Sequence, residues 1–579
     1  MRVRYSTQIW IPNELLGENW RLSNELPFVN IRAVISTRRI RLASRKEVET
    51  LRILRAMNFA VLVAALCLLS RAEVLAADIG VLELSAVDAS AGRTVPARVR
   101  IRDHSGADCV PAGASVVPIA GDKWFPTVGP VSLRLPAGAV SIRVERGLEY
   151  EPAKESVTVR AGEKVTHKVE LRRWINLREQ GYVSGENHIH VPAEKLGAML
   201  VAEDLNFGTS LHWWNEPRFE QQSHGPWHND LKADSHTIPT SVFDAEVEHP
   251  WGPVYLVGLR EPVSIASDAK RSNLPFVKSA HAQGALVCYQ AGWSREVLAD
   301  ALLGYVDVVN VCNNNFQRHR FQARRRYSNL LEVEGFPMYP NTAEGMLQMN
   351  YETYYRLLNY GLRLAAGAGS AVGVKSSPCG YNRAYLRAGD NPSLAEFLQA
   401  WRKGRNFVTN GPMIFLSTKD GRKPGDTIDL PLAGGKVTLR VEVHSDQSLR
   451  IIEIVANGKV MARSDLTGSQ REHALTCSFG VNEGTWVVAR CTDEDRLLSD
   501  EELGRYVQGK GTKMPPEPTR LRFAHTSPIY VTVGSKMPRV EASVAEARKM
   551  LDAFKRFARK QADEKYLAEI MDPLPSDIP

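Results

Sequence analysis

Two kinds of hydrophobic pattern divide this chain of 579 residues. Between Trp174 and Gly411, short apolar runs such as GALVCYQ alternate with amphipathic stretches such as AEKLGAMLVAEDL and NYETYYRLLNYGL. Such alternation of strand and helix patterns is typical of a parallel sheet or a β/α barrel, in which functional side chains gather at the carboxyl ends of strands. The region 174–411 is therefore predicted to be an α/β domain that contains the functional site.

The segments on either side of this region show only the two-residue alternation of β-strands. VPARVRIRD and KVTHKVELRR lie in residues 80–172, and KVTLRVEVHS and TWVVARCTD lie in residues 412–535. Each block is predicted to be a β-sandwich, and the first looks similar to the carboxypeptidase regulatory-like modules of secreted enzymes. Apolar residues at helical spacing predict a helical tail over 540–579. The predicted fold class is multidomain, α/β plus all-β.

The net charge of +8 is concentrated at the amino terminus. Residues 1–56 hold 11 Lys/Arg and 5 Asp/Glu, so they account for +6 of it, and the rest of the chain is close to neutral. A basic surface for nucleic acid is therefore not expected on the body of the protein.

A short apolar run, NFAVLVAALCLLS, follows Arg52 and Arg55 and ends shortly before Ala77. This arrangement predicts a signal peptide over residues 57–76, and hence a periplasmic or secreted protein with no stable membrane span after cleavage. An uncleaved anchor is the alternative. Met57 is an alternative start, which would make residues 1–56 an extension that is not translated.

The segment GENHIH, Gly185–His190, contains two histidines at a spacing of two. On an extended strand such residues point to the same face, so both imidazoles can bind one divalent metal ion. A His-x-His pair alone has low specificity, because two strand histidines in a polar network produce the same pattern.

Three further stretches support the interpretation of GENHIH as a metal-binding motif. They are VFDAEVEHPWGPVYLVGL, VDVVNVCNNN and GRNFVTNGP. Over roughly residues 180–415 the chain resembles the PHP superfamily of metallohydrolases, specifically its carbaryl-hydrolase-like CehA/McbA branch. GENHIH resembles the opening metal motif GDLHxH, and VDVVNVCNNN resembles a strand ending in NNH. The resemblance implies a distorted β/α barrel, flanked here by the two β-sandwiches, with zinc, manganese or iron at its mouth.

The resemblance implies metal ligands at His188, His190, Glu246 and His212, of which the first three are also the candidate catalytic residues. Trp214 lies beside His212 and is a candidate wall of the substrate pocket. For His212 and Trp214 an aromatic rim of the core is the alternative, and for Glu246 the alternative is a solvated turn.

Arg318 and Arg320 follow a predicted strand end, and Arg383 is expected near the same face. Guanidinium groups bind sulfate, phosphate or uronate through paired hydrogen bonds. These arginines are therefore candidate contacts for an anionic small-molecule or glycan substrate. A solvated basic face is the alternative.

Neutral residues stand where relatives carry metal ligands. Asn187 replaces the aspartate of GDLHxH, Gln290 ends a strand where relatives place His or Glu, and Asn315 stands at the histidine of NNH. Gly369–Ala371 replaces a late Asp-x-His. Because amides are poor ligands for transition metals, one bound ion is predicted instead of a full cluster.

Two functions are compatible with these residues. The first is an exported metal-dependent hydrolase of an ester, amide or phosphoester that uses metal-activated water. The second is a catalytically degenerate relative that serves as a glycan- or partner-binding module, and a structural surface protein is a third interpretation.

Overall fold

The computed structural model describes residues that all belong to one structural unit, Ala76–Pro579. The predicted signal peptide and the extension before it lie outside the described residues, as does Arg320. No helix in the described part of the chain is long and apolar enough to cross a membrane. The structure describes residues 79–119, 121–214, 230–233, 236–265, 268–318, 331, 333–340, 342–493, 521–576 and 578.

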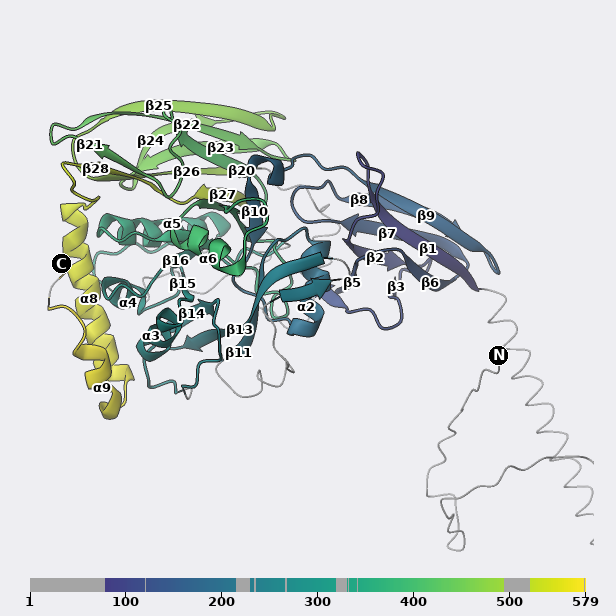
Figure 1. Cartoon of the computed structure of the whole chain (residues 1–579), viewed down its shortest axis with the longest axis horizontal. Helices are drawn as coiled ribbons and strands as arrows, with labels where there is room; N and C mark the ends of the chain where they lie inside the picture. Colours follow the sequence, from purple (N-terminus) through teal and green to yellow (C-terminus); the bar gives the residue numbers. More distant parts are fainter. Residues whose placement is uncertain are drawn as a thin grey trace, which may run out of the picture. The chain divides into compact units, whose positions relative to one another are not determined.

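The first block consists of two sheets that share one apolar core (Figure 1). Alternate residues of β1, such as Leu82 and Leu84, are buried in this core, as the two-residue pattern predicts. The block is therefore sandwich-like. One sheet has the order β6 (Val131–Pro136), β1 (Ile79–Asp88), β9 (Lys164–Leu171), and the other has the order β4 (Val117–Ile119), β5 (Asp122–Thr127), β2 (Ala97–Arg102), β7 (Gly138–Glu145), β8 (Ala153–Val159), with β3 (Asp108–Cys109) beside β2.

The central sheet is mixed, whereas the sequence pattern predicted a parallel one. Strands β13 (His236–His249) and β14 (Gly252–Val257) pair antiparallel, because only Pro250 and Trp251 separate them and so short a link cannot form a crossover. Strand β15 (Leu286–Gln290) also pairs antiparallel with β14, across a longer connection that contains a helix. The pairs β11–β13, β15–β16 and β16–β17 are parallel. The sheet order is β11 (Gly208–Trp214), β13 (His236–His249), β14 (Gly252–Val257), β15 (Leu286–Gln290), β16 (Val308–Cys312), β17 (Ala365–Ala368), with β12 (Asp230–Ala233) beside β13.

The segment Ser184–His190 connects the two ends of this sheet. On one side its carbonyl groups accept hydrogen bonds from the backbone N–H groups of Phe207 and Leu211, at 3.1 and 3.0 Å. On the other side its N–H groups donate to the carbonyl oxygens of Ala368 and Val372, at 3.2 and 2.9 Å. The sheet therefore curves back on itself, and the two histidines lie in the segment that joins its ends.

Helices cover the central sheet, and all but α2 pack on its main core. Helix α2 (Ala193–Ala202) contributes to the separate apolar cluster that includes Ile189. Helix α5 begins at a Thr342 N-cap, and α6 begins with a Ser393 capping box, so both starts agree with their local sequence. The helices are α2 (Ala193–Ala202), α3 (Leu274–Ala282), α4 (Val297–Leu302), α5 (Ala343–Asn359) and α6 (Leu394–Arg402), with a 3₁₀ turn at Arg178–Gln180.

A third large sheet crosses the predicted domain boundary at residue 411. Its members before this boundary are β10, β18 and β19, and its members after it belong to the second β block. The sheet packs on β20, β22 and β25 through a shared core that includes Leu416, Val441 and Ile454. The strands are β10 (Tyr182–Gly185), β18 (Arg383–Arg387), β19 (Asn406–Thr409), β27 (Arg522–Thr526), β26 (Thr485–Asp493), β23 (Leu449–Ala456), β24 (Lys459–Asp465), β21 (Thr427–Leu430), β28 (Ile529–Val533), β20 (Met413–Thr418), β22 (Gly435–His444) and β25 (Glu472–Val481).

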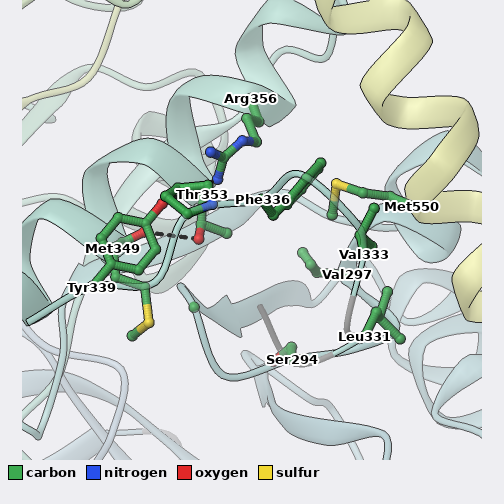
Figure 2. Close-up of a pocket in the computed structure, with 12 residues that line it drawn as sticks. Ser294, Val297, Leu331, Val333, Phe336, Tyr339, Met349, Thr353, Arg356 and Met550 are labelled. Carbon is green, nitrogen blue, oxygen red and sulfur yellow. Dashed lines mark hydrogen bonds between the residues drawn. The ribbon is translucent and has the colours of Figure 1, made fainter. Parts of the chain in front are cut away.

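The carboxyl-terminal tail forms two helices, α8 (Glu541–Gln561) and α9 (Glu564–Met571). Helix α8 packs on α4 and α5, and the ring of Trp251 lies 5.2 Å from the ring of Phe557. A cavity of about 60 Å³ lies where α4, α5 and α8 meet (Figure 2). Its lining includes Val297, Met349 and Met550, so it is mainly apolar, and none of the predicted metal ligands lines it.

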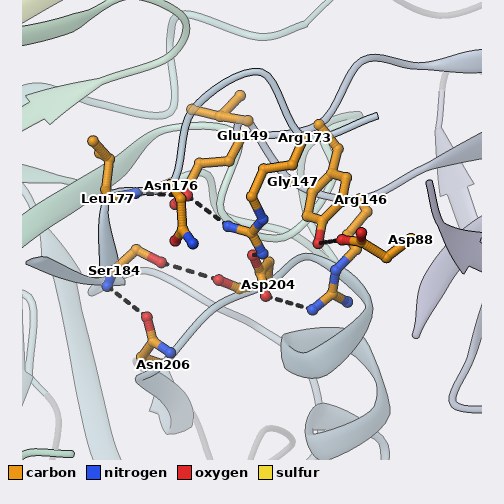
Figure 3. Close-up of polar contacts among 12 residues, drawn as sticks. Asp88, Arg146, Gly147, Glu149, Arg173, Asn176, Leu177, Ser184, Asp204 and Asn206 are labelled. Carbon is orange, nitrogen blue, oxygen red and sulfur yellow. Dashed lines mark hydrogen bonds and ion pairs between the residues drawn. The ribbon is translucent and has the colours of Figure 1, made fainter. Parts of the chain in front are cut away.

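Ion pairs connect the first sandwich to the loop after α2 (Figure 3). The guanidinium of Arg173 binds the carboxylates of Glu149 and Asp204, both at 2.7 Å, and Arg146 also binds Asp204. Asp204 has a φ of 55°, which is unfavourable for a residue other than glycine. The two arginines therefore stabilise a strained turn that follows α2.

A buried acid predicts how stability depends on pH. Burial raises the pKa of Asp300 from 3.8 to about 7, although the Tyr289 hydroxyl donates a hydrogen bond to it. Burial and the charge of Asp300 also raise the pKa of Glu296. The folded protein thus keeps a proton that the unfolded chain loses above about pH 4, so this contribution to stability is present in acid and is lost as the pH rises to about 7.

We expect Asp300→Asn, which resembles the protonated acid, to reduce the loss of unfolding free energy between pH 4 and pH 7 by a few kcal/mol. Urea unfolding across this pH range measures the unfolding free energy at each pH. The matched control is Asp552→Asn on the exposed face of α8, which should behave like the wild type. Equal pH dependence in all three proteins would contradict the assignment.

Candidate metal centre

Three side chains that can bind a metal meet in the central region. His188 and His190 extend from the segment that joins the ends of the sheet, and Glu246 extends from β13. All three are buried, with exposed fractions of 2%, 6% and 3%. Ile189, between the histidines, packs in a separate apolar cluster, as expected when neighbouring residues on an extended chain point to opposite faces.

The separations of the donor atoms suit a common ion. The two Nε2 atoms are 3.0 Å apart, and Glu246 Oε2 lies 3.0 Å from His190 Nε2 and 3.4 Å from His188 Nε2. Atoms that bind one ion at about 2.0–2.2 Å, with angles between octahedral and tetrahedral values, lie roughly 2.8–3.6 Å from one another. Two imidazoles and a carboxylate are therefore spaced as three adjacent ligands of one ion would be.

The electrostatics favour the protonation states that bind metal. Burial lowers the pKa of His188, and the charges of His190 and Lys375 act in the same direction. Burial alone would raise the pKa of Glu246, but the neighbouring histidines lower it to about 2. Neutral imidazole and ionised carboxylate are the forms that coordinate divalent cations.

Tyr255 positions both His188 and Gln290. Its ring lies 4.2 Å from the His188 ring, and its hydroxyl donates to Gln290 Oε1 at 2.7 Å. Tyr255 pairs with Glu246 in the β13–β14 register, so the hairpin that presents the carboxylate also presents this ring. His188 Nδ1 has no hydrogen-bond partner among the described residues, and its ring orientation therefore depends on packing.

Amide side chains occupy positions where the family resemblance implied ligands. Asn187 and Asn310 exchange two hydrogen bonds of 2.8 Å, and both are fully buried. Asn315 donates to Asn313 Oδ1 at 3.0 Å. These amides bind one another and so stabilise the strand ends. Among the described residues, the two histidines and Glu246 remain as the group that could hold a metal ion.

Of the remaining predicted site residues, the structure describes the side chains of Arg318 and Arg383, and these do not join this group. Trp214 pairs with Glu246 along β11 and β13, but the side chains of Trp214 and His212 lie outside the described residues. Arg318 forms a paired contact with Glu145 of the first sandwich, and Arg383 donates to backbone carbonyl groups. Both arginines are buried, so the alternative of a solvated basic face does not apply to them.

Two residues near the site were not identified from the sequence. Tyr255 could have been found, because a tight hairpin at Pro250–Trp251 places it opposite Glu246. Lys375 could not, since it lies in the irregular segment after β17 and carries no motif of its own.

No protein-family model and no curated protein matches this chain. Among solved structures, a minor pilin of Streptococcus agalactiae, GBS52, matches 17% of this chain and 46% of its own length at 18% identity and a TM-score of 0.15. The TIE protein of Bacillus anthracis matches 19% of each chain at 21% identity and a TM-score of 0.13. The chain thus spans less than half the length of either protein, and likenesses this partial support no conclusion about function.

Gly369 allows the histidine segment to approach the end of β17. A Cβ atom at this position would lie 2.4 Å from His188 Cβ and 2.9 Å from Asn187 Oδ1. We therefore expect Gly369→Ala to displace His188 and to lower the unfolding free energy by about 1–3 kcal/mol. Denaturant unfolding measures the loss, with Gly129→Ala as control because its Cβ would meet nothing within 4 Å. Equal stability of the two variants would contradict this close approach.

Proposed function

We propose that this protein is an exported, metal-dependent hydrolase of the PHP type that acts on an ester, amide or phosphoester. The observation that supports the proposal is the convergence of three buried donor atoms within 3.0–3.4 Å of one another. Their chemistry, two imidazoles and one carboxylate, suits zinc, manganese or iron, and three ligands suit one ion better than a cluster.

His188, His190 and Glu246 would hold the cation. A divalent cation in such a site lowers the pKa of water and polarises a scissile bond. Tyr255 holds the His188 ring in place, and the positive charge of Lys375 favours the neutral form of that ring. Lys375 is half-buried, and its charge would also attract an anionic substrate.

The resemblance of GENHIH and the later motifs to the CehA/McbA branch adds to this proposal. The curved sheet and its joining segment are compatible with a distorted β/α barrel of that type. The signal-peptide pattern before Ala77 supports a periplasmic or secreted location. A small molecule or glycan is the proposed substrate class, and nucleic acid is not.

A second candidate function is a catalytically degenerate relative that binds a glycan or a protein partner. The buried Asn187–Asn310 pair favours it, because the amide of Asn187 stands where a ligand was expected and binds Asn310 instead. In that case the histidines and Glu246 would be a remnant that stabilises the fold.

Metal content and hydrolysis separate the two functions. We expect the full chain, purified after growth with zinc, manganese and iron, to contain about one ion and to cleave a member of a panel of chromogenic esters, amides and phosphoesters. His188→Ala and His190→Ala each remove a ligand and should weaken metal binding by more than about 100-fold, with loss of hydrolysis. Elemental analysis and initial rates measure both effects.

The matched control is His281→Ala, since His281 is an exposed histidine on α3, and this variant should keep metal and activity. Metal without hydrolysis of any panel member would favour the binding function. Unchanged metal content in the His188 and His190 variants would overturn the metal assignment.

A further inference from the structure

A small polar cavity lies where the first sandwich, the central region and the second β block meet. Its volume is about 40 Å³, and a water-sized centre needs about 10–15 Å³ of such space. The guanidinium groups of Arg98, Arg318, Arg383 and Arg522 line it. All four arginines are buried, with exposed fractions of 4% or less. Arginines rarely occur at such burial without an anionic partner.

The carboxylates at the cavity are shared among several arginines. Glu145 binds Arg98 at 2.6 Å and forms a paired contact with Arg318. Glu145 also binds Arg143, at 2.9 Å. Glu203 binds Arg98 at 2.5 Å. Each carboxylate therefore neutralises only part of the positive charge around it.

Charge and hydrogen bonding are unbalanced on one side of the cavity. Arg522 binds two carboxylates, Asp446 and Asp493, so negative charge exceeds positive charge in this group. In contrast, Arg98 and Arg318 share Glu145 with Arg143, and of these arginines Glu203 binds only Arg98. The side chain of Arg383 donates to backbone carbonyl groups and interacts with Glu149 and Asp204 through charge alone.

Two buried donors at the cavity lack an acceptor. Arg98 Nη1 and Arg318 Nε make no hydrogen bond in the described structure. A buried donor without a partner has lost its hydrogen bonds to water without replacing them, which is most unfavourable when the group is charged. An acceptor with negative charge, placed between the two guanidinium groups, would satisfy both donors and offset the excess charge.

We propose that this cavity binds a small inorganic anion, such as chloride or sulfate, between Arg98 and Arg318. Arg98 belongs to β2 of the first sandwich, and Arg318 follows β16 of the central region. The anion would therefore connect two blocks of the chain and stabilise their junction. This site is separate from His188, His190 and Glu246, and it does not depend on the proposed hydrolase function.

Thermal unfolding of the full chain tests the proposal. Sodium chloride and sodium sulfate are titrated separately at constant ionic strength, which is maintained with sodium gluconate because its polyhydroxy chain is too large for the cavity. We expect a saturable rise of the midpoint with at least one of the two anions, since a ligand that binds only the folded state stabilises it. The anion whose effect on the midpoint saturates at the lower concentration is the one that fits the cavity better.

Arg318→Lys keeps the charge but removes the Nε–H donor and the paired contact with Glu145. We expect this variant to require at least about tenfold more anion for the same rise. If Arg318→Lys does not fold, Arg98→Lys is used in its place, because it removes the other donor that lacks an acceptor. The control is Arg172→Gln, an exposed arginine of the same sandwich paired with Glu151, which should respond like the wild type.

Crystals soaked in sodium bromide provide a direct second measurement. An anomalous peak within hydrogen-bond reach of Arg98 and Arg318 supports the proposal. The proposal is overturned if the unfolding midpoint rises without saturation and equally in the wild type and Arg318→Lys. It is also overturned if the soaked crystals show no bromide in the cavity.

Discussion

The candidate site depends on the backbone hydrogen bonds that join Ser184–His190 to both ends of the central sheet. On one side the segment binds Phe207 and Leu211, and on the other it binds Ala368 and Val372. Strands that are far apart in sequence are thereby connected through seven residues. Because the segment is extended, His188 and His190 lie on one face and Ile189 on the other.

The same connection determines which acid meets the histidines. Strand β13 pairs with β11 next to the joining segment, so Glu246 lies near the two rings. Burial lowers the pKa of His188 although the charge of Glu246 opposes this shift, and the neighbouring histidines lower the pKa of Glu246. A cation would replace the close Nε2–Nε2 contact with two favourable bonds, and for this reason we propose a metal centre here and not a simple polar network.

Local patterns were sufficient for much of the fold. The alternation in TWVVARCTD matches β26, and the Asn457-Gly458 turn separates β23 and β24, as expected for a tight hairpin. The His-x-His spacing was enough to place both rings on one face. The sequence analysis missed the mixed character of the central sheet, although the Pro250–Trp251 link between β13 and β14 is too short for a crossover and so indicates an antiparallel pair.

Long-range pairing could not be predicted from the sequence. The arginine at position 318 was identified as an anion contact, but its partner Glu145 lies 173 residues away in another block. The Asn187–Asn310 pair spans 123 residues and depends on the closure of the sheet. Such contacts follow from topology, which no local spacing encodes.

The most direct test of the account is X-ray absorption spectroscopy of the purified full chain at the zinc, manganese and iron edges. We expect one bound ion with two imidazole nitrogens and at least one carboxylate oxygen as ligands, at about 2.0–2.2 Å. A protein that holds none of these metals, or a metal without imidazole ligands, would contradict it.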